Sequence, residues 1–186
     1  MCAMLKLFFS MVVLLTLFSC NKTVSNESNF AIPNGDFEQW DVNNNLSIWQ
    51  TNSCPLCLPA WETYIVQKTT DAAHGSFAGE FLYNNYYPAF AINKFAIASH
   101  PLKLTAYIKS SIIGGDTATL RIALSLGDHI VDSGNWYETT TNDNYRKLEI
   151  PITQTSSKVY SAEVIIMGGN KVGTIFFVDN LEFSYK

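Results

Sequence analysis

The sequence lacks a cluster of basic residues. Its 186 residues include 12 Lys and Arg against 16 Asp and Glu, which gives a formal net charge of −4. Binding nucleic-acid phosphates requires Lys and Arg gathered on one surface, so we expect no nucleic-acid partner. Charged residues make up only 15% of the chain, whereas aromatic residues reach 13%. This balance is typical of a packed β domain with some aromatic rings left for a binding surface.

Cysteine is scarce as well, with four in the chain, and only Cys54 and Cys57 form a CxxC pair. A zinc site would need a second pair or suitably spaced histidines, and the three histidines are scattered. The flanking residues indicate a loop, not the helix start that lowers a thiol pKa in redox motifs. A loop disulfide or two ordinary thiols is therefore favoured over metal binding and over redox chemistry.

Catalytic motifs are missing too: there is no nucleophile elbow, no zinc-binding helix and no phosphate loop. Glycoside hydrolysis requires two carboxyl groups about 5–10 Å apart across a cleft. Glu62, Glu80 and Glu138 are conceivable candidates, but no pattern brings two of them together. We expect a protein that is not an enzyme.

The N-terminus has a basic start at Lys6, an apolar run over residues 7–18 and a small residue before Cys20. This pattern predicts a secretory signal peptide, since crossing about 30 Å of hydrocarbon takes about 20 residues. A cysteine directly after the cut resembles the lipobox of bacterial lipoproteins, whose thiol is acylated, although Phe18 is bulkier than usual. The alternative is an ordinary signal peptide with a chance cysteine.

Three segments follow from this interpretation. Residues 1–19 form the signal peptide, and the polar residues 20–29 form a flexible tether with Cys20 as the lipidation site. Residues 30–186 form one domain. The protein would be exported to the cell envelope, with the outer membrane as the expected location, and would contact the membrane through its anchor only.

Alternation of apolar and polar residues dominates the domain and predicts half-buried strands. Turn signals separate the strands, among them Gly114-Gly115, Gly127-Asp128, Ser133-Gly134-Asn135 and Gly168-Gly169. No segment keeps a helical period. Eight or nine short strands predict an all-β fold, an antiparallel β-sandwich of the jelly-roll type. The expected strands lie at or near residues 61–68, 76–82, 89–97, 102–109, 120–126, 145–152, 164–166 and 175–183.

The domain opens with Asn34-Gly35-Asp36-Phe37-Glu38 and closes with Val178-Asp179-Asn180-Leu181, with Ala72-Ala73-His74-Gly75-Ser76 between them. These segments resemble the jelly rolls of carbohydrate-binding modules of family 4/9 and related galactose-binding-like type. Together with the lipobox, the chain looks like the small exported lipoproteins common in Bacteroidetes.

The resemblance also implies a structural calcium ion, held in that family by an acid of the opening motif and an acid of the closing strand. These correspond to Glu38 and Asp179. Asp179 shares the parity of Ile175 and Phe177, so we expect it to point toward the buried face, where an unpaired carboxylate is costly. Asn180 departs from the family pattern, which often has a second Asp. The alternative is a strand bend that lets Asp179 cap local amides.

A glycan-binding surface needs flat aromatic rings with polar groups around them. Candidate ligand-binding residues are Trp61 after the cysteine loop, Tyr86 and Tyr87 in an Asn-rich loop, and Trp136 with Tyr137. The favoured function is a lipid-anchored module that binds a polysaccharide or other glycan. The alternatives are an assembly lipoprotein that contacts another envelope protein and, least favoured, a small hydrolase.

Overall fold

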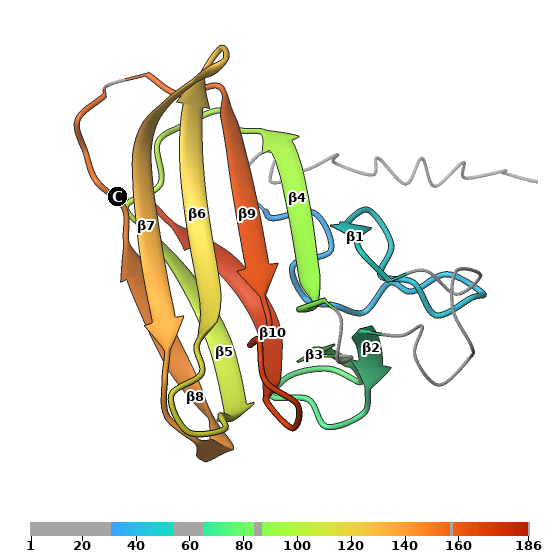
Figure 1. Cartoon of the computed structure of the whole chain (residues 1–186). Helices are drawn as coiled ribbons and strands as arrows, with labels where there is room; N and C mark the ends of the chain where they lie inside the picture. The colour runs from blue at the N-terminus through green and yellow to red at the C-terminus, as the bar shows by residue number, and fades with distance from the viewer. Residues whose placement is uncertain (1–30, 54–64, 84–86, 157, 186) are drawn as a thin grey trace, which may run out of the picture.

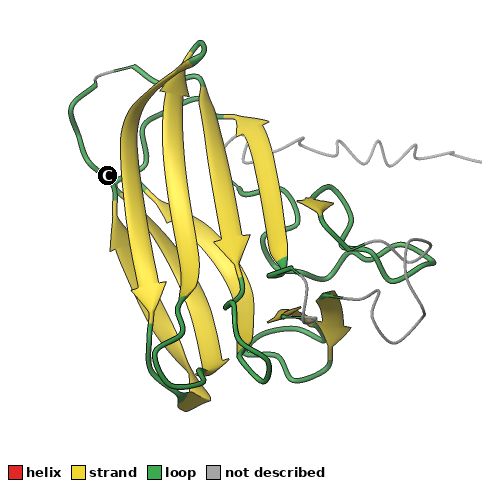
Figure 2. Ribbon diagram, viewed as in Figure 1, coloured by secondary structure: helices red, strands yellow, loops and turns green. Residues whose placement is uncertain are grey.

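The structure, a computed structural model, describes residues 31–53, 65–83, 87–156 and 158–185. The described chain forms strands and loops and contains no helix (Figures 1 and 2). The strands are β1 (Gln50–Thr51), β2 (Val66–Thr69), β3 (Ala78–Leu82), β4 (Phe90–Ala96), β5 (Lys103–Ser111), β6 (Ala118–Leu126), β7 (His129–Glu138), β8 (Asn142–Pro151), β9 (Ser161–Met167) and β10 (Ile175–Ser184).

Two five-stranded antiparallel sheets pack face to face as a β-sandwich. The first, with strand order β1-β4-β9-β6-β7, lies in front in Figure 1 and is called the front sheet below. The second, with strand order β2-β3-β10-β5-β8, lies behind it and is called the back sheet. The predicted all-β jelly-roll sandwich is thus confirmed.

The core lies between the sheets and is built by the predicted alternation. On β5, Leu104 and Ile108 are fully buried, and on β6, Leu120 and Ile122 are fully buried. Burying a side chain of this size contributes on the order of 1.5–3 kcal/mol, so these alternating positions hold the two sheets together. Trp49 of the opening segment is also buried, and its ring stacks on Phe37.

Strand β7 departs from the prediction. Ser133-Gly134-Asn135 was expected to form a turn but lies within the strand, with Gly134 opposite Ile122 of β6. A Cβ on Gly134 would lie 2.5 Å from the Pro151 carbonyl oxygen and 2.8 Å from the Ile150 side chain. The glycine is there because the two sheets approach closely, not because the chain turns.

The expected direction of Asp179 was wrong. Phe176 and Val178 are the fully buried residues of this part of β10, so Ile175, Phe177 and Asp179 point away from the core. The register then shifts between Asp179 and Glu182, and Asn180 adopts a positive φ of 45°. This β-bulge returns the later residues of β10 to the core, which is why a single parity did not describe the whole strand.

Candidate functional site

Outward side chains on four strands of the front sheet form one surface, which we call the outer face. Because Leu120 and Ile122 fill the core, the residues between and beside them on β6 point outward. No described segment is drawn across these strands in Figure 1. The outer face comprises Phe90, Ile92 and Lys94 of β4, Glu163, Ile165 and Met167 of β9, Thr119, Arg121 and Ala123 of β6, and Ser133, Asn135 and Tyr137 of β7.

Tyr137 is the most exposed aromatic ring of the outer face, with 62% of its surface accessible. The strand register places Thr119, Met167 and Phe90 beside it in one row across the sheet. Three strand spacings separate Tyr137 from Phe90, about 14 Å. The row therefore presents aromatic rings at both ends of a span that an extended ligand can cover.

Trp136 points the other way. Its register partner is Leu120 in the core, and its ring packs against the core. The indole Nε1 donates to Glu138 Oε2 at 3.4 Å, and the Arg146 guanidinium lies 5.3 Å from the ring centroid. Successive residues of a strand face opposite sides, so one ligand cannot stack on both Trp136 and Tyr137. The outer face keeps only Tyr137 of this predicted pair.

The middle of the outer face is polar. Arg121 lies between Ile165 of β9 and Asn135 of β7 in the register. In the neighbouring row, Lys94 and Glu163 are direct cross-strand partners. Sequence reasoning missed Arg121 because it searched for aromatic rings. The signal was present in the alternation, which puts Arg121 opposite in direction to the core residues beside it.

Several predicted residues fall outside the described part of the chain: Cys20, Cys54, Cys57, Trp61 and Tyr86. Of the predicted tyrosine pair, Tyr87 is described and is 63% exposed. It precedes β4 by three residues, at the end of the front sheet where Phe90 begins the row that leads to Tyr137. Its position is compatible with the predicted role.

Glu38 and Asp179 converge on the same turn, residues 71–77, which lies over the back sheet. Asp179 Oδ2 accepts hydrogen bonds from the amides of Ala73 and His74, both at 2.8 Å. Glu38 Oε1 accepts from the amides of Ser76 at 2.7 Å and Phe77 at 2.9 Å. Asp179 is fully buried by this turn, and the burial raises its pKa even though the amide hydrogen bonds act to lower it.

These contacts bear on the calcium prediction. Calcium takes six to eight oxygen ligands, many of them carbonyls. Here N–H groups face Glu38 and Asp179, and in the described ranges no three His, Cys, Asp or Glu side chains gather as metal ligands. The amide contacts of Asp179 match the alternative in which it caps local amides. Calcium binding stays a prediction for solution measurements.

Of the carboxylates considered for catalysis, Glu62 lies outside the described residues, and Glu80 and Glu138 do not form a pair. Glu138 is buried beneath the front sheet, where it is ion-paired with Arg146 and accepts from Thr140 Oγ1 at 2.8 Å. Glu80 lies on the outside of the back sheet, in register with Phe177, where burial and then the charge of Asp71 raise its pKa. The two carboxylates therefore do not face a common cleft, as glycoside hydrolysis requires.

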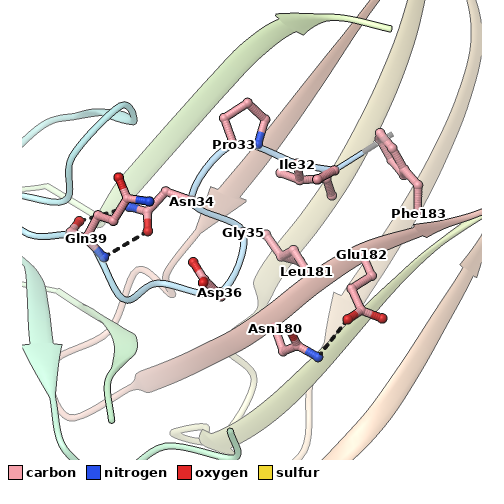
Figure 3. A pocket seen from close by; sticks show the side chains of 11 residues that line it. Ile32, Pro33, Asn34, Gly35, Asp36, Gln39, Asn180, Leu181, Glu182 and Phe183 are labelled. Atoms are coloured by element: carbon pink, nitrogen blue, oxygen red, sulfur yellow. Dashed lines mark hydrogen bonds between the residues drawn. The ribbon is translucent and has the colours of Figure 1, made fainter. Parts of the chain in front are cut away.

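A groove of about 700 Å³ lies where the opening segment crosses β10 (Figure 3). Its polar side chains include Asp36, Asn180 and Glu182, and the Asn180 amide donates to Glu182 Oε1 at 3.2 Å. Figure 3 shows these side chains together with Phe183, whose ring contacts Phe95 at a centroid distance of 6.0 Å. The chain enters the groove at Ala31, so the groove marks the place where the predicted tether joins the domain.

Solved structures of similar fold include a carbohydrate-binding module and proteins described as glycoside hydrolases. TmCBM61, solved in complex with β-1,4-galactotriose, has a TM-score of 0.54 at 13% identity, over 86% of this chain and 97% of that one. A provisionally assigned glycoside hydrolase from Bacteroides thetaiotaomicron has a TM-score of 0.58 at 9% identity, over 74% of this chain and 63% of that one. An arabinose-bound α-L-arabinofuranosidase, MgGH51, has a TM-score of 0.55 at 11% identity, over 84% of this chain and 26% of that one.

The fold is therefore that of a carbohydrate-binding-module-like β-sandwich. This chain spans nearly all of TmCBM61 but less than two thirds of the Bacteroides protein. No protein-family model matches the sequence, and no curated protein matches it. No helix long and apolar enough to cross a bilayer occurs among the residues that the structure describes.

Proposed function

We propose that this protein is a lipid-anchored, non-catalytic glycan-binding protein of the cell envelope, and that the outer face is its binding surface. The observation that carries this proposal is the arrangement of Tyr137 and Phe90 at two ends of a row that no described segment covers. Arg121 and Asn135 lie in the neighbouring row. Aromatic rings supply stacking surface for sugar rings, and the polar groups supply hydrogen bonds to hydroxyls.

The fold and the predicted anchor support the proposal. TmCBM61 has the same kind of sandwich and was solved with a galactose trisaccharide. Acylation of Cys20 would keep the domain within tether reach of a membrane, so a bound polysaccharide would be held at the cell envelope. Glu80 lies on the outside of the back sheet whereas Glu138 is buried, and this separation favours binding over hydrolysis.

Contact with another envelope protein is the second candidate. Three exposed apolar side chains lie near the tip of the β6–β7 hairpin: Leu126 at 36%, Ile130 at 56% and Tyr160 at 61% exposure. The Tyr160 amide donates to the Ser125 carbonyl at 2.9 Å, which keeps Tyr160 beside this hairpin. Exposed apolar groups of this kind favour protein contacts.

One binding experiment separates the two candidates. The full chain, purified in mild detergent, is tested on a panel of immobilised polysaccharides, alongside Tyr137→Ala and the matched control Tyr160→Ala. We expect Tyr137→Ala to weaken binding about tenfold, as loss of an aromatic anchor does, and Tyr160→Ala to bind normally. Absence of binding to every polysaccharide, or equal binding by Tyr137→Ala, would contradict the proposal.

A further inference from the structure

Among the residues that the structure describes, Arg121 is a cation of the outer face without an ion-pair partner. The chain has two arginines, and the other, Arg146, is ion-paired with Glu138 and lies over the Trp136 ring. Within the described ranges Arg121 has no comparable partner, and its Nε is buried without a hydrogen bond. The two arginines of one sandwich thus have opposite environments.

An arginine in this position needs an acceptor. Its guanidinium is always charged and carries five N–H donors in a fixed fork. A buried N–H without an acceptor costs free energy. A hydrogen bond from a charged donor contributes more free energy than one from a neutral donor. The register neighbours do not supply a negative charge, because Ile165 is apolar and Asn135 is neutral.

The other charged groups of the outer face offset each other. Lys94 and Glu163 are direct cross-strand partners, so their charges act in opposite senses at the same place. Arg121 is what remains, and it makes this surface locally positive on a chain whose formal net charge is −4. A negatively charged ligand group would therefore be attracted to this surface more than to the rest of the molecule.

We propose that the outer face binds an acidic polysaccharide, in which the carboxylate of a uronic acid residue pairs with Arg121. This proposal rests on the glycan-binding function above and narrows the ligand to uronic-acid polymers. A carboxylate is planar and accepts two parallel N–H bonds from a guanidinium. Asn135 lies beside Arg121 to hydrogen-bond sugar hydroxyls, and Tyr137 lies two residues further along β7 to stack on a neighbouring ring.

The experiment uses polymers that differ only in charge. Polygalacturonate, alginate and a glucuronic-acid polymer are each immobilised beside their carboxyl-reduced forms, and binding of the full chain in mild detergent is measured. We expect at least one acidic polymer to bind at least about tenfold more tightly than its reduced form. Arg121→Gln should remove this preference, and Arg121→Lys should restore it only in part. Lys147→Gln, a matched control on β8 of the back sheet, should keep it.

The outcomes separate this inference from the function on which it rests. Binding to reduced polymers as tight as to acidic ones, or an acidic preference that Arg121→Gln retains, overturns the uronate inference and leaves glycan binding intact. Equal losses in Arg121→Gln and Lys147→Gln indicate attraction by charge alone and also overturn it. Absence of binding to all polymers, with thermal unfolding of the variants unchanged, overturns the proposed function itself.

Discussion

Asp132 offers the sharpest test of how the sandwich is held together. Its side chain is fully buried and accepts four hydrogen bonds. Three come from Thr155 and Ser156 in the chain leading into β9, and one comes from His100 between β4 and β5. Oδ1 accepts from the amide and hydroxyl of Thr155, at 2.8 and 2.7 Å. Oδ2 accepts from the Ser156 amide at 3.0 Å and faces His100 Nε2 at 2.9 Å. Asp132→Asn keeps the shape but puts an amide NH₂ at one of the two oxygens.

The expected loss follows from these contacts. The asparagine oxygen keeps the two bonds to Thr155, while its NH₂ group meets the donors of Ser156 and His100. Each hydrogen bond to a charged group contributes about 1.5–3 kcal/mol, so losing two costs about 3–6 kcal/mol. In a domain of this size about 2–4 °C of melting temperature corresponds to each kcal/mol, which predicts a fall on the order of 10 °C.

The assay is urea unfolding followed by tryptophan fluorescence, with Asp128→Asn in the exposed turn of the same hairpin as the control. Burial alone would raise the pKa of Asp132, but the hydrogen bonds from Thr155, His100 and Ser156 hold it well below its ordinary value. A lowered folded-state pKa gives stability that is present above the unfolded pKa of about 3.9 and is lost as the pH falls. The difference in free energy of unfolding between the wild type and Asp132→Asn should therefore be largest at neutral pH and decrease in acid. A loss below about 1 kcal/mol, or one that does not change with pH, refutes the reasoning.

Three further predictions follow. Gly134→Ala should destabilise the fold by about 1–3 kcal/mol in urea unfolding, because the new Cβ would meet the Pro151 carbonyl oxygen at 2.5 Å; wild-type stability would contradict the close approach of the sheets. If Glu38 and Asp179 hold a calcium ion, EDTA should lower the melting temperature, and an unchanged melting temperature would contradict calcium binding. Cys20→Ser should move the protein from the membrane fraction to the soluble fraction, and an unchanged distribution would argue against lipidation.

The strands of the middle of the chain were predictable because their alternation is simple. On β5 and β6 every second residue is aliphatic, and the structure buries Leu104, Ile108, Leu120 and Ile122 as that pattern indicates. The turns at Gly115 and Gly127 were predictable for a related reason, since both glycines adopt a positive φ that other residues avoid. Local chemistry was sufficient in these segments.

Long-range packing decided the segments that were predicted wrongly. Gly134 looks like a turn residue in the sequence, but its role is to admit the Pro151 carbonyl of β8, which is far along the chain. Asp179 looks like a core position, but the bulge at Asn180 changes the direction of β10 after it. Neither the partner strand nor the bulge can be deduced from the residues that flank these positions.

The same distinction explains what was found of the binding surface. Trp136 and Tyr137 were predicted together as ligand-binding residues because both are aromatic and because they are adjacent, next to a predicted turn. Because the segment is a strand, adjacent side chains point to opposite faces. Trp136 packs against the core and Tyr137 is exposed on the outer face. The residues that share a face with Tyr137 come instead from other strands, Arg121 from β6 and Phe90 from β4. A binding surface on a sheet is therefore defined by the register between strands, which brings residues distant in sequence to one face. The Arg121 variants test whether such a residue determines the ligand specificity of this face.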